Sequence, residues 1–516
     1  ETDESMVTKM HYVDFKPQEP KLITQRYPKT GTNNPMVRLG LIDIKRKKTK
    51  WVQLEPYEYI CRVKWHPDNT RLFVQTMSRD QRELDAFYVN RKSGKMLKKI
   101  FTEKDSAWVN INDDLYFLEN GTFIWQSERD GFAHLYRFKD SGELVNQITK
   151  GKWALRSSGG PFWLRQSVQA INENIGKIYF TAMKESSVER HLYSVDLAGK
   201  NIEKISKEKG VHSIGCSPNG EYYFDKFSDS STPPMLSLHS ISGEVVKIID
   251  KPKLDLIIDM ELQTPELFTI PTSDGFPMPA QILKPADFDE TKEYPLIYHV
   301  YGGPSAPTVF DSWQGSSLLY DNILLRNGYL VVRFDHRSAT AISKTLENRV
   351  HLMISGPIEM EDIVDGIRWL KSKDFVDPKR VGIWGWSGGG SFTLNAMTNT
   401  PEFKAGISGA PVTDWHYYDT KWGEFAMKRP QDNPEGYEKT SFVKSAKNLK
   451  GRLLLIHGTY DDNVHPQNSW HFIDELIKHD IMFDMMFYPM RMHGFKDKPA
   501  QIHRQKKMIE FWKNYL

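Results

Sequence analysis

The spacing of apolar runs in the first half of the chain predicts a β-rich domain. Short β-type runs alternate there with turns, and four similar segments centre on turns at Asn69, Gly121, Gly176 and Gly220, 44 to 55 residues apart. Short strands repeating at about this period are typical of propeller blades. We therefore predict a β-propeller of about four and a half blades over residues 1–258, with a β-sandwich as the alternative.

The second half, residues 259–516, has a different pattern. Fully apolar runs that suit buried strands alternate with longer helical segments. The apolar runs are Tyr294–Val300, Gly328–Phe334, Val381–Trp384, Leu453–Ile456 and Met485–Tyr488. Strands that alternate with helices form a mainly parallel sheet covered on both faces. The chain is thus expected to combine an all-β half with an α/β half.

Composition excludes several classes of function. The chain has 516 residues, with 69 Lys and Arg against 66 Asp and Glu, so its net charge of +3 does not suit a nucleic-acid binder. No apolar run approaches the roughly 18 residues of a membrane-spanning helix. The two cysteines, Cys61 and Cys216, cannot form a disulfide framework or a cysteine-ligated zinc site. No His, Asp and Glu cluster has ligand spacing, so neither metal nor cofactor is expected.

The strongest local motif is Gly385-Trp-Ser-Gly-Gly389, a G-x-S-x-G sequence. It directly follows the strand Val381–Trp384 and directly precedes a helical run. A nucleophile elbow needs that context, because the glycines allow a tight strand-to-helix turn that exposes the serine. Ser387 is therefore the candidate nucleophile.

A nucleophilic serine needs a base, and the base needs an orienting carboxylate. In α/β-hydrolases these follow the serine in the order acid, then histidine. The acidic loop after the strand Leu453–Ile456 offers Asp461 or Asp462, and the spacing does not choose between them. His493, after the last predicted strand, is the candidate base. Two rival histidines flank the acidic loop and better suit structural roles: His457 and His465.

The charge on the attacked carbonyl also needs hydrogen-bond donors. The backbone N–H of Gly388 is one candidate, because it directly follows the nucleophile. The loop Val300-Tyr-Gly-Gly-Pro304 follows an early strand and is placed to supply a second donor, such as the hydroxyl of Tyr301. Without the other motifs, this loop would be interpreted as an ordinary glycine-rich strand end.

Together these segments resemble the prolyl oligopeptidase family, and within it the bacterial dipeptidyl peptidase IV branch. The matching stretches are Val-Tyr-Gly-Gly-Pro, Gly-Trp-Ser-x-Gly-Gly, His-Gly-Thr-x-Asp-Asp-Asn-Val-His and His493-Gly494. The propeller half agrees through Ser127–Tyr136 and Glu189–Val195. The resemblance covers nearly the whole chain. It implies a β-propeller that covers an α/β-hydrolase, with the active site in the cavity between them.

By resemblance, Ser387 is the nucleophile, His493 the general base and acid, and Asp461 the orienting acid. Tyr301 corresponds to the oxyanion hydroxyl, and Asn463 to the residue that holds a carbonyl of the substrate. The walls of the pocket for proline or alanine correspond to Val412, Trp415, Tyr418, Trp422 and Val464. The resemblance implies a serine exopeptidase that releases X-Pro or X-Ala dipeptides from free peptide N-termini. Such a flat aromatic pocket suits a pyrrolidine ring.

Three stretches depart from the family pattern. Gly388 and Trp422 both stand where the family usually has tyrosine, which changes the walls of the specificity pocket. The stretch Phe334–Ala341, including Ser338–Ala341, replaces the usual Arg-Gly-x-Gly loop. We also find no paired-glutamate motif for the substrate's α-ammonium, and Thr2–Ser5 resembles the stretch just downstream of that motif. The first blades are therefore expected to come from a preceding segment or a second chain.

The sequence leaves other functions open. One alternative is a family peptidase or esterase of altered specificity, and another is a catalytically silent peptide-binding subunit. The resemblance further implies a homodimer in the periplasm or secreted from a bacterium, with the cytoplasm as the alternative.

Overall fold

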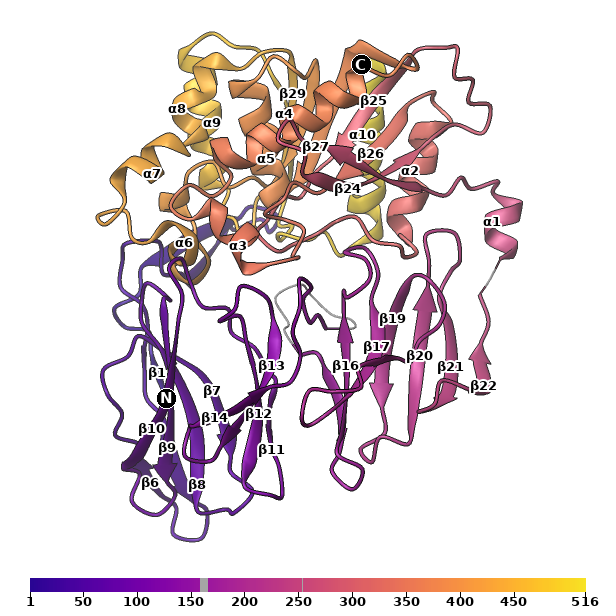
Figure 1. The fold of residues 1–516 in the computed structure, drawn as a ribbon. Coiled ribbons are helices and arrows are strands. Elements are labelled where there is room, and N and C mark those ends of the chain that lie inside the picture. The colour runs from indigo at the N-terminus through magenta and orange to yellow at the C-terminus, as the bar shows by residue number, and fades with distance from the viewer. Residues whose placement is uncertain (158–165, 253) are drawn as a thin grey trace.

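The computed structural model describes residues 1–157, 166–252 and 254–516. The first half consists of antiparallel sheets (Figure 1). Four of them have four strands each, consecutive in the chain. The first sheet contains β7 (Tyr59–Trp65), β8 (Arg71–Met77), β9 (Glu83–Asn90) and β10 (Met96–Lys104), and the second contains β11 (Leu115–Phe117), β12 (Thr122–Ser127), β13 (His134–Lys139) and β14 (Leu144–Gln147). The third contains β15 (Val168–Asn172), β16 (Lys177–Ala182), β17 (His191–Asp196) and β18 (Glu203–Lys204), and the fourth contains β19 (Val211–Cys216), β20 (Tyr222–Ser228), β21 (Met235–Ser240) and β22 (Val245–Asp250). These are the blade-like units that the turn spacing predicts.

Three smaller strand pairs precede these sheets. They are β1 (Thr2–Asp3) with β4 (Met36–Val37), β2 (Lys9–Asp14) with β3 (Lys21–Arg26), and β5 (Gly40–Asp43) with β6 (Lys48–Trp51). The predicted count of four and a half blades stays a prediction. So does the domain boundary between residues 258 and 259, which falls within α1 (Asp255–Asp259).

The second half is built on one eight-stranded sheet. Its order is β23-β24-β26-β25-β27-β28-β29-β30, and the six strands from β26 to β30 in that order run parallel. The strands are β23 (Glu266–Pro271), β24 (Pro277–Leu283), β25 (Tyr294–His299), β26 (Leu330–Phe334), β27 (Val376–Trp386), β28 (Ala405–Gly409), β29 (Arg452–Gly458) and β30 (Asp484–Tyr488). The predicted fold class, antiparallel blades followed by an α/β-hydrolase sheet, is confirmed.

Helices connect these strands and cover the sheet. They are α2 (Ser316–Leu325), α3 (Lys344–Glu347), α4 (Pro357–Lys371), α5 (Gly388–Asn399), α6 (Thr420–Met427), α7 (Pro434–Lys439), α8 (Phe442–Ser445), α9 (Gln467–Lys478) and α10 (Lys498–Tyr515), with 3-10 turns at Asn348–Val350, Trp415–Tyr417 and Ala446–Asn448. Successive residues of β25 serve opposite faces. Leu296 packs into the cluster that includes residues of α4 and α5, and Ile297 into the cluster with α2 and α10.

The burial patterns explain why the two halves have different hydrophobic patterns in the sequence. In β20 exposed and buried positions alternate, as expected for an antiparallel strand with one solvated face. In β29 every residue from Leu453 onward is buried, because helices cover both faces of the central sheet. The core of the propeller half is rich in aromatic rings: Phe73, Phe101 and Phe123 pack against one another, with centroids 6.0 to 6.3 Å apart.

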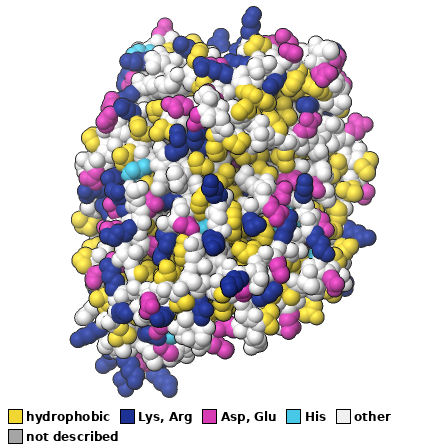
Figure 2. Space-filling view, viewed as in Figure 1, with side chains coloured by type: hydrophobic (Ala, Val, Ile, Leu, Met, Phe, Trp, Pro, Cys, Tyr) yellow, Lys and Arg dark blue, Asp and Glu magenta, His cyan; other side chains and the backbone are white. Residues whose placement is uncertain are grey.

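The surface is mixed in charge. Figure 2 shows basic and acidic side chains interspersed over most of one face, with small apolar areas between them. Among the described residues, no helix is both long and apolar enough to cross a lipid bilayer.

An ion pair links the propeller half to α6. Arg79, just after β8, donates through Nε and Nη2 to the two carboxylate oxygens of Glu424, both over 2.8 Å. The Glu424 side chain is fully buried, and the backbone N–H of Gly31 also donates to it over 2.7 Å. The propeller half therefore helps to hold the helix that carries Trp422.

Removing Arg79 is expected to destabilise the protein strongly. In an Arg79→Met variant Glu424 would keep a buried charge without its bidentate partner, which costs about 3–5 kcal/mol of unfolding free energy. Urea denaturation followed by tryptophan fluorescence measures the change. Arg46→Met is the matched control, because Arg46 is exposed and lies 3.9 Å from Asp43; such pairs contribute about 0–1 kcal/mol. Equal losses in the two variants would contradict the prediction.

Candidate active site

The predicted nucleophile lies at a sharp turn between β27 and α5. Ser387 has φ 60° and ψ −121°, a conformation that residues with a side chain rarely adopt. The glycines around it are required by close packing. A Cβ atom on Gly385 would lie 2.4 Å from the carbonyl oxygen of Val300, and one on Gly389 would lie 2.1 Å from the same atom. The motif therefore forms the elbow that its sequence context predicts.

The predicted base and acid are hydrogen-bonded to each other. His493 Nδ1 lies 2.8 Å from Asp461 Oδ2, and the Asp461 side chain is fully buried. The other oxygen, Oδ1, accepts from the backbone N–H groups of Asn463 and Val464 over 3.1 and 2.8 Å. Burial acts to raise the pKa of Asp461, but hydrogen bonds from His457 and His493 outweigh it and hold the pKa at about 2. Asp461 is thus ionised and aimed at His493.

This geometry bears on the choices that the spacing left open. Asp461, rather than Asp462, contacts His493. The rival His457 also contacts Asp461, with Nε2 3.2 Å from Oδ2. It is fully buried, however, with Nδ1 2.7 Å from Ser469 Oγ and Nε2 2.8 Å from the carbonyl oxygen of Val464. Its environment suits a structural role, since both of its nitrogens are occupied. The catalytic roles themselves stay predictions.

The loops of the predicted nucleophile and base are tied together. Trp386, which directly precedes Ser387, donates from Nε1 to the backbone oxygen of His493 over 2.9 Å. The ring of Trp386 also packs edge-on against Phe495, two residues after the histidine. The position of the His493 loop is therefore coupled to the elbow.

Tyr301 lies beside the N-terminus of α5. A Cβ atom on Gly388 would lie 4.0 Å from a ring carbon of Tyr301 and 3.5 Å from its backbone oxygen. Burial raises the pKa of the Tyr301 hydroxyl to about 12, so the hydroxyl remains a donor at neutral pH. The backbone N–H of Gly388 belongs to the first turn of a twelve-residue helix, where the helix dipole favours negative charge. The Tyr301 ring thus lies close to Gly388, which is the other predicted oxyanion donor.

The predicted walls of the specificity pocket share one apolar cluster. Its buried members include Val412, Trp415, Tyr418 and Val464, and Trp422 packs against it half-buried. Asn463 joins this group, because its Oδ1 accepts from the Tyr418 hydroxyl over 3.1 Å. The structure therefore brings all five predicted walls and Asn463 together.

The same cluster has members that no sequence motif marks, among them Trp108. Trp108 follows β10 in the propeller half, is 2% exposed, and packs edge-on against Phe425 with ring centroids 4.7 Å apart. Phe425 in turn contacts Trp422, with centroids 4.9 Å apart. The only local signal is a tryptophan in an otherwise polar stretch. The propeller half thus supports the pocket wall formed by Trp422.

The unusual stretch Phe334–Ala341 is buried and anchored. Arg337 makes ion pairs with Asp362 and Asp274 over 2.7 Å. His336 Nε2 lies 2.9 Å from the backbone oxygen of Gly302, directly after Tyr301. Despite its different sequence, this loop therefore braces the strand end that carries the predicted oxyanion hydroxyl.

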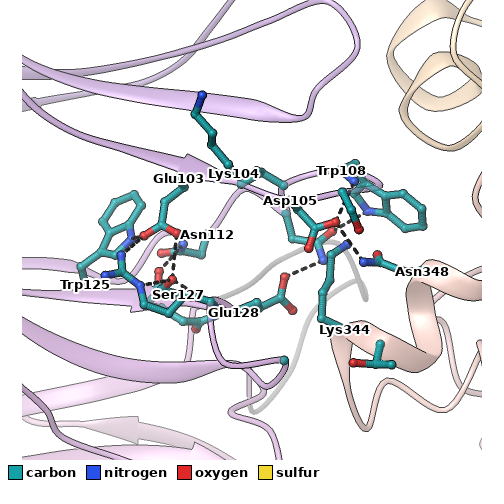
Figure 3. A pocket seen from close by; sticks show the side chains of 17 residues that line it. Glu103, Lys104, Asp105, Trp108, Asn112, Trp125, Ser127, Glu128, Lys344 and Asn348 are labelled. Atoms are coloured by element: carbon teal, nitrogen blue, oxygen red, sulfur yellow. Dashed lines mark hydrogen bonds and ion pairs between the residues drawn. The ribbon is translucent and has the colours of Figure 1, made fainter.

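A cavity of about 260 Å³ lies between the propeller half and α3, and Trp108 forms part of its wall (Figure 3). Its lining is polar. Glu103 accepts hydrogen bonds from Trp125 Nε1 and Ser127 Oγ, and Asp105 accepts one from Asn348 Nδ2 over 2.9 Å. The carboxylates of Glu103 and Asp105 are thus hydrogen-bonded to neighbouring side chains of the cavity wall. Among the described residues, no three or more His, Cys, Asp and Glu side chains gather to hold a metal ion.

Comparisons with known proteins agree with this architecture. Residues 1–234 match the model described as the dipeptidyl peptidase IV N-terminal region, and residues 317–516 match that of the prolyl oligopeptidase family. Mouse dipeptidyl peptidase 8 is 27% identical over 592 residues, which cover 100% of this chain and 66% of that protein. A probable dipeptidyl-aminopeptidase B of Arthroderma gypseum is 30% identical, with 91% of this chain and 53% of that protein covered.

Solved structures show the same fold. Dipeptidyl peptidase 4 of Porphyromonas gingivalis superposes with a TM-score of 0.93 at 29% identity, covering 100% of this chain and 72% of that chain. A putative dipeptidyl aminopeptidase IV from Bacteroides ovatus gives 0.92 at 28% identity, with 100% and 75% covered. The chain spans no more than two thirds of the length of the curated relatives named above. With both of its halves matched, the chain belongs to the prolyl oligopeptidase family.

Proposed function

We propose that the protein is a serine exopeptidase that releases N-terminal dipeptides whose second residue is proline or alanine. The observation that carries this proposal is the His493–Asp461 hydrogen bond of 2.8 Å, joined through Trp386 to the elbow of Ser387. The names of the relatives, dipeptidyl peptidases and a dipeptidyl-aminopeptidase, support it.

The reaction would proceed through an acyl-enzyme. Ser387 Oγ attacks the carbonyl carbon of the second residue, and His493 takes the hydroxyl proton and passes it to the leaving amine of the third residue. Asp461 holds the ring so that Nδ1 carries its proton and stabilises the imidazolium that forms. The N–H of Gly388 and the hydroxyl of Tyr301 donate to the developing oxyanion. Water then reverses the sequence and frees the dipeptide.

The pocket supports the choice of a small, flat second residue. Trp415 and Tyr418 are buried and meet edge-on, with ring centroids 5.9 Å apart. Such walls bury an apolar pyrrolidine or methyl group and offer few hydrogen bonds to a polar side chain. We expect Asn463, whose Oδ1 accepts from Tyr418, to donate through its Nδ2 to a substrate carbonyl.

The experiment that tests this proposal compares a chromogenic Gly-Pro amide with its N-blocked counterpart. Release from the free dipeptide alone, blocked by a serine-directed inhibitor, would support the exopeptidase. Release from both would favour a family peptidase or esterase of altered specificity, the second candidate, which the unusual Gly388 favours. Silence on both would favour a peptide-binding subunit without catalysis.

Gly388→Tyr is expected to narrow specificity. A Cβ atom on Gly388 would make only ordinary van der Waals contacts, with Tyr301. A tyrosine ring at this position can therefore add the missing wall of the pocket. The ratio of kcat/KM for proline over larger second residues should rise by about 10-fold, because a pocket that excludes one or two methylene groups discriminates by about this factor. Gly388→Ala is the control, since it improves helix propensity without adding a ring. An unchanged ratio in Gly388→Tyr would contradict the prediction.

Partners and location extend the proposal. A homodimer, a further segment or chain that completes the propeller, and a periplasmic or secreted location stay predictions. Light scattering of the purified full-length protein and fractionation of its source cells would test them.

A further inference from the structure

A β-hairpin near the start of the chain contacts the loop that carries Asp461. Three consecutive backbone oxygens of this loop accept hydrogen bonds from the hairpin. Tyr12 OH donates to the oxygen of Asp461 over 3.0 Å, Gln25 Nε2 to that of Asp462 over 3.1 Å, and Tyr27 OH to that of Asn463 over 2.8 Å. We call residues 461–464 the acid loop.

The strand register explains how one hairpin presents these donors together. In the β2–β3 pair Tyr12 lies opposite Ile23, and Gln25 lies opposite Met10. Because side chains two apart on a strand share a face, Tyr12 and Gln25 point the same way. Gln25 Oε1 lies 3.1 Å from the Tyr12 hydroxyl, so the single hydroxyl proton is shared between this oxygen and that of Asp461. Tyr27, directly after β3, continues the row.

The hairpin and the Asp461 side chain hold different backbone groups of the acid loop. Within the loop, Asp461 Oδ1 already accepts from the N–H groups of Asn463 and Val464. These bonds hold two backbone N–H groups of the loop. The hairpin instead holds the backbone oxygens of residues 461 to 463. The next residue, His465, is buried against the rings of Tyr12 and Tyr27, with centroid distances of 5.6 and 4.1 Å.

The donors keep their protons. Burial, with smaller effects from neighbouring carboxylates, raises the pKa of the Tyr12 and Tyr27 hydroxyls well above the usual value. Burial, with a smaller effect from Lys29, lowers the pKa of His465 to about 4, so its ring is neutral against them. The two hydroxyls therefore remain hydrogen-bond donors at neutral pH.

We propose that Tyr12, Gln25 and Tyr27 are positioning residues that hold the acid loop, and through it His493 and the pocket, in working geometry. The inference rests on the proposed function only in that Ser387, Asp461 and His493 act as a triad. Tyr12 holds the residue that orients the base, so its loss should slow the chemistry. Tyr27 holds Asn463, so its loss should weaken substrate binding.

Isosteric variants separate these effects. Tyr12→Phe should lower kcat by about two- to tenfold with little change in KM, the effect of losing one neutral hydrogen bond. Tyr27→Phe should raise KM by about two- to tenfold with a smaller change in kcat. The triple variant Tyr12→Phe, Gln25→Leu and Tyr27→Phe should lose about 10²-fold in kcat/KM, because misplacement of the loop affects every catalytic group on it.

The matched controls lie on the opposite face of the same hairpin. His11 and Thr24 are exposed and contact each other over 3.1 Å, away from the acid loop. His11→Ala and Thr24→Val should leave kcat and KM at the values of the unmodified protein. Thermal denaturation of every variant shows whether the fold is retained.

A second readout separates this inference from the proposed function. The rate at which a fluorophosphonate labels Ser387 depends on activation of the serine and not on peptide specificity. If the Gly-Pro substrate is not cleaved but Tyr12→Phe slows labelling by about two- to tenfold, the proposed specificity fails and the positioning role stands. Labelling and kinetics unchanged in both tyrosine variants would overturn the positioning role. Losses of activity that are proportional to the fraction of unfolded protein would also overturn the positioning role.

Discussion

Replacing Ser387 with alanine is expected to lower kcat by about 10⁴-fold or more, because the acyl-enzyme can no longer form. The fold should be retained. Ser387 already holds a Cβ atom at φ 60°, so alanine meets the same backbone strain and adds none. Dipeptide release is the measurement of activity, and thermal denaturation is that of the fold.

Ser387→Gly is a sharper control for the same prediction. Glycine also lacks the nucleophile, but it adopts a positive φ without steric cost. We expect it to be as inactive as the alanine variant and to unfold with a free energy about 1 kcal/mol higher. Activity retained in either variant would exclude Ser387 as the nucleophile.

Asp461→Asn is expected to lower kcat by about 10⁴-fold, because an amide favours the wrong tautomer of the base. In the protein both oxygens of Asp461 are acceptors, with His493 Nδ1 and, at 3.2 Å, His457 Nε2 on one and two backbone N–H groups on the other. An asparagine can keep the backbone bonds only by turning its Nδ2 toward the histidine. That geometry allows Nε2, rather than Nδ1, to carry the proton, and the ring can no longer accept one from Ser387.

Asp462→Asn is the neighbouring control. Asp462 is half-buried and its side chain lies outside the contact with His493. Its charge is near the surface, where single interactions are weak, so we expect a loss in kcat of less than about tenfold. Measuring kcat for both variants at neutral pH tests the choice between adjacent aspartates. A larger loss for Asp462→Asn would contradict the assignment of Asp461.

Local signals allowed much of the fold to be predicted. The apolar run at Leu453–Ile456 lies within β29, and the run at Tyr294–Val300 matches β25 to within one residue. These strands could be located because burial on both faces leaves few polar residues in them. The elbow could be predicted for a steric reason, since Gly385 and Gly389 stand where any Cβ atom would collide with Val300.

Other features had no local signal. The order of the central sheet places β26 between β24 and β25, which no periodicity in the chain reveals. The choice between Asp461 and Asp462 depends on which carboxylate faces His493 after folding. More than 300 residues of chain separate Trp108 from Phe425, and the donors of the β2–β3 hairpin from the acid loop. The neighbouring sequence therefore does not predict these contacts.

The hairpin contact also has a consequence for the order in which the molecule assembles. Tyr12 and the backbone oxygen that it binds are 449 residues apart. During synthesis the hairpin leaves the ribosome long before the acid loop exists, and contacts between distant residues form late. The face that carries Tyr12 and Gln25 therefore stays uncovered until the central sheet is complete. Protection of this hairpin from protease would mark the end of folding, and its acquisition would coincide with the appearance of activity.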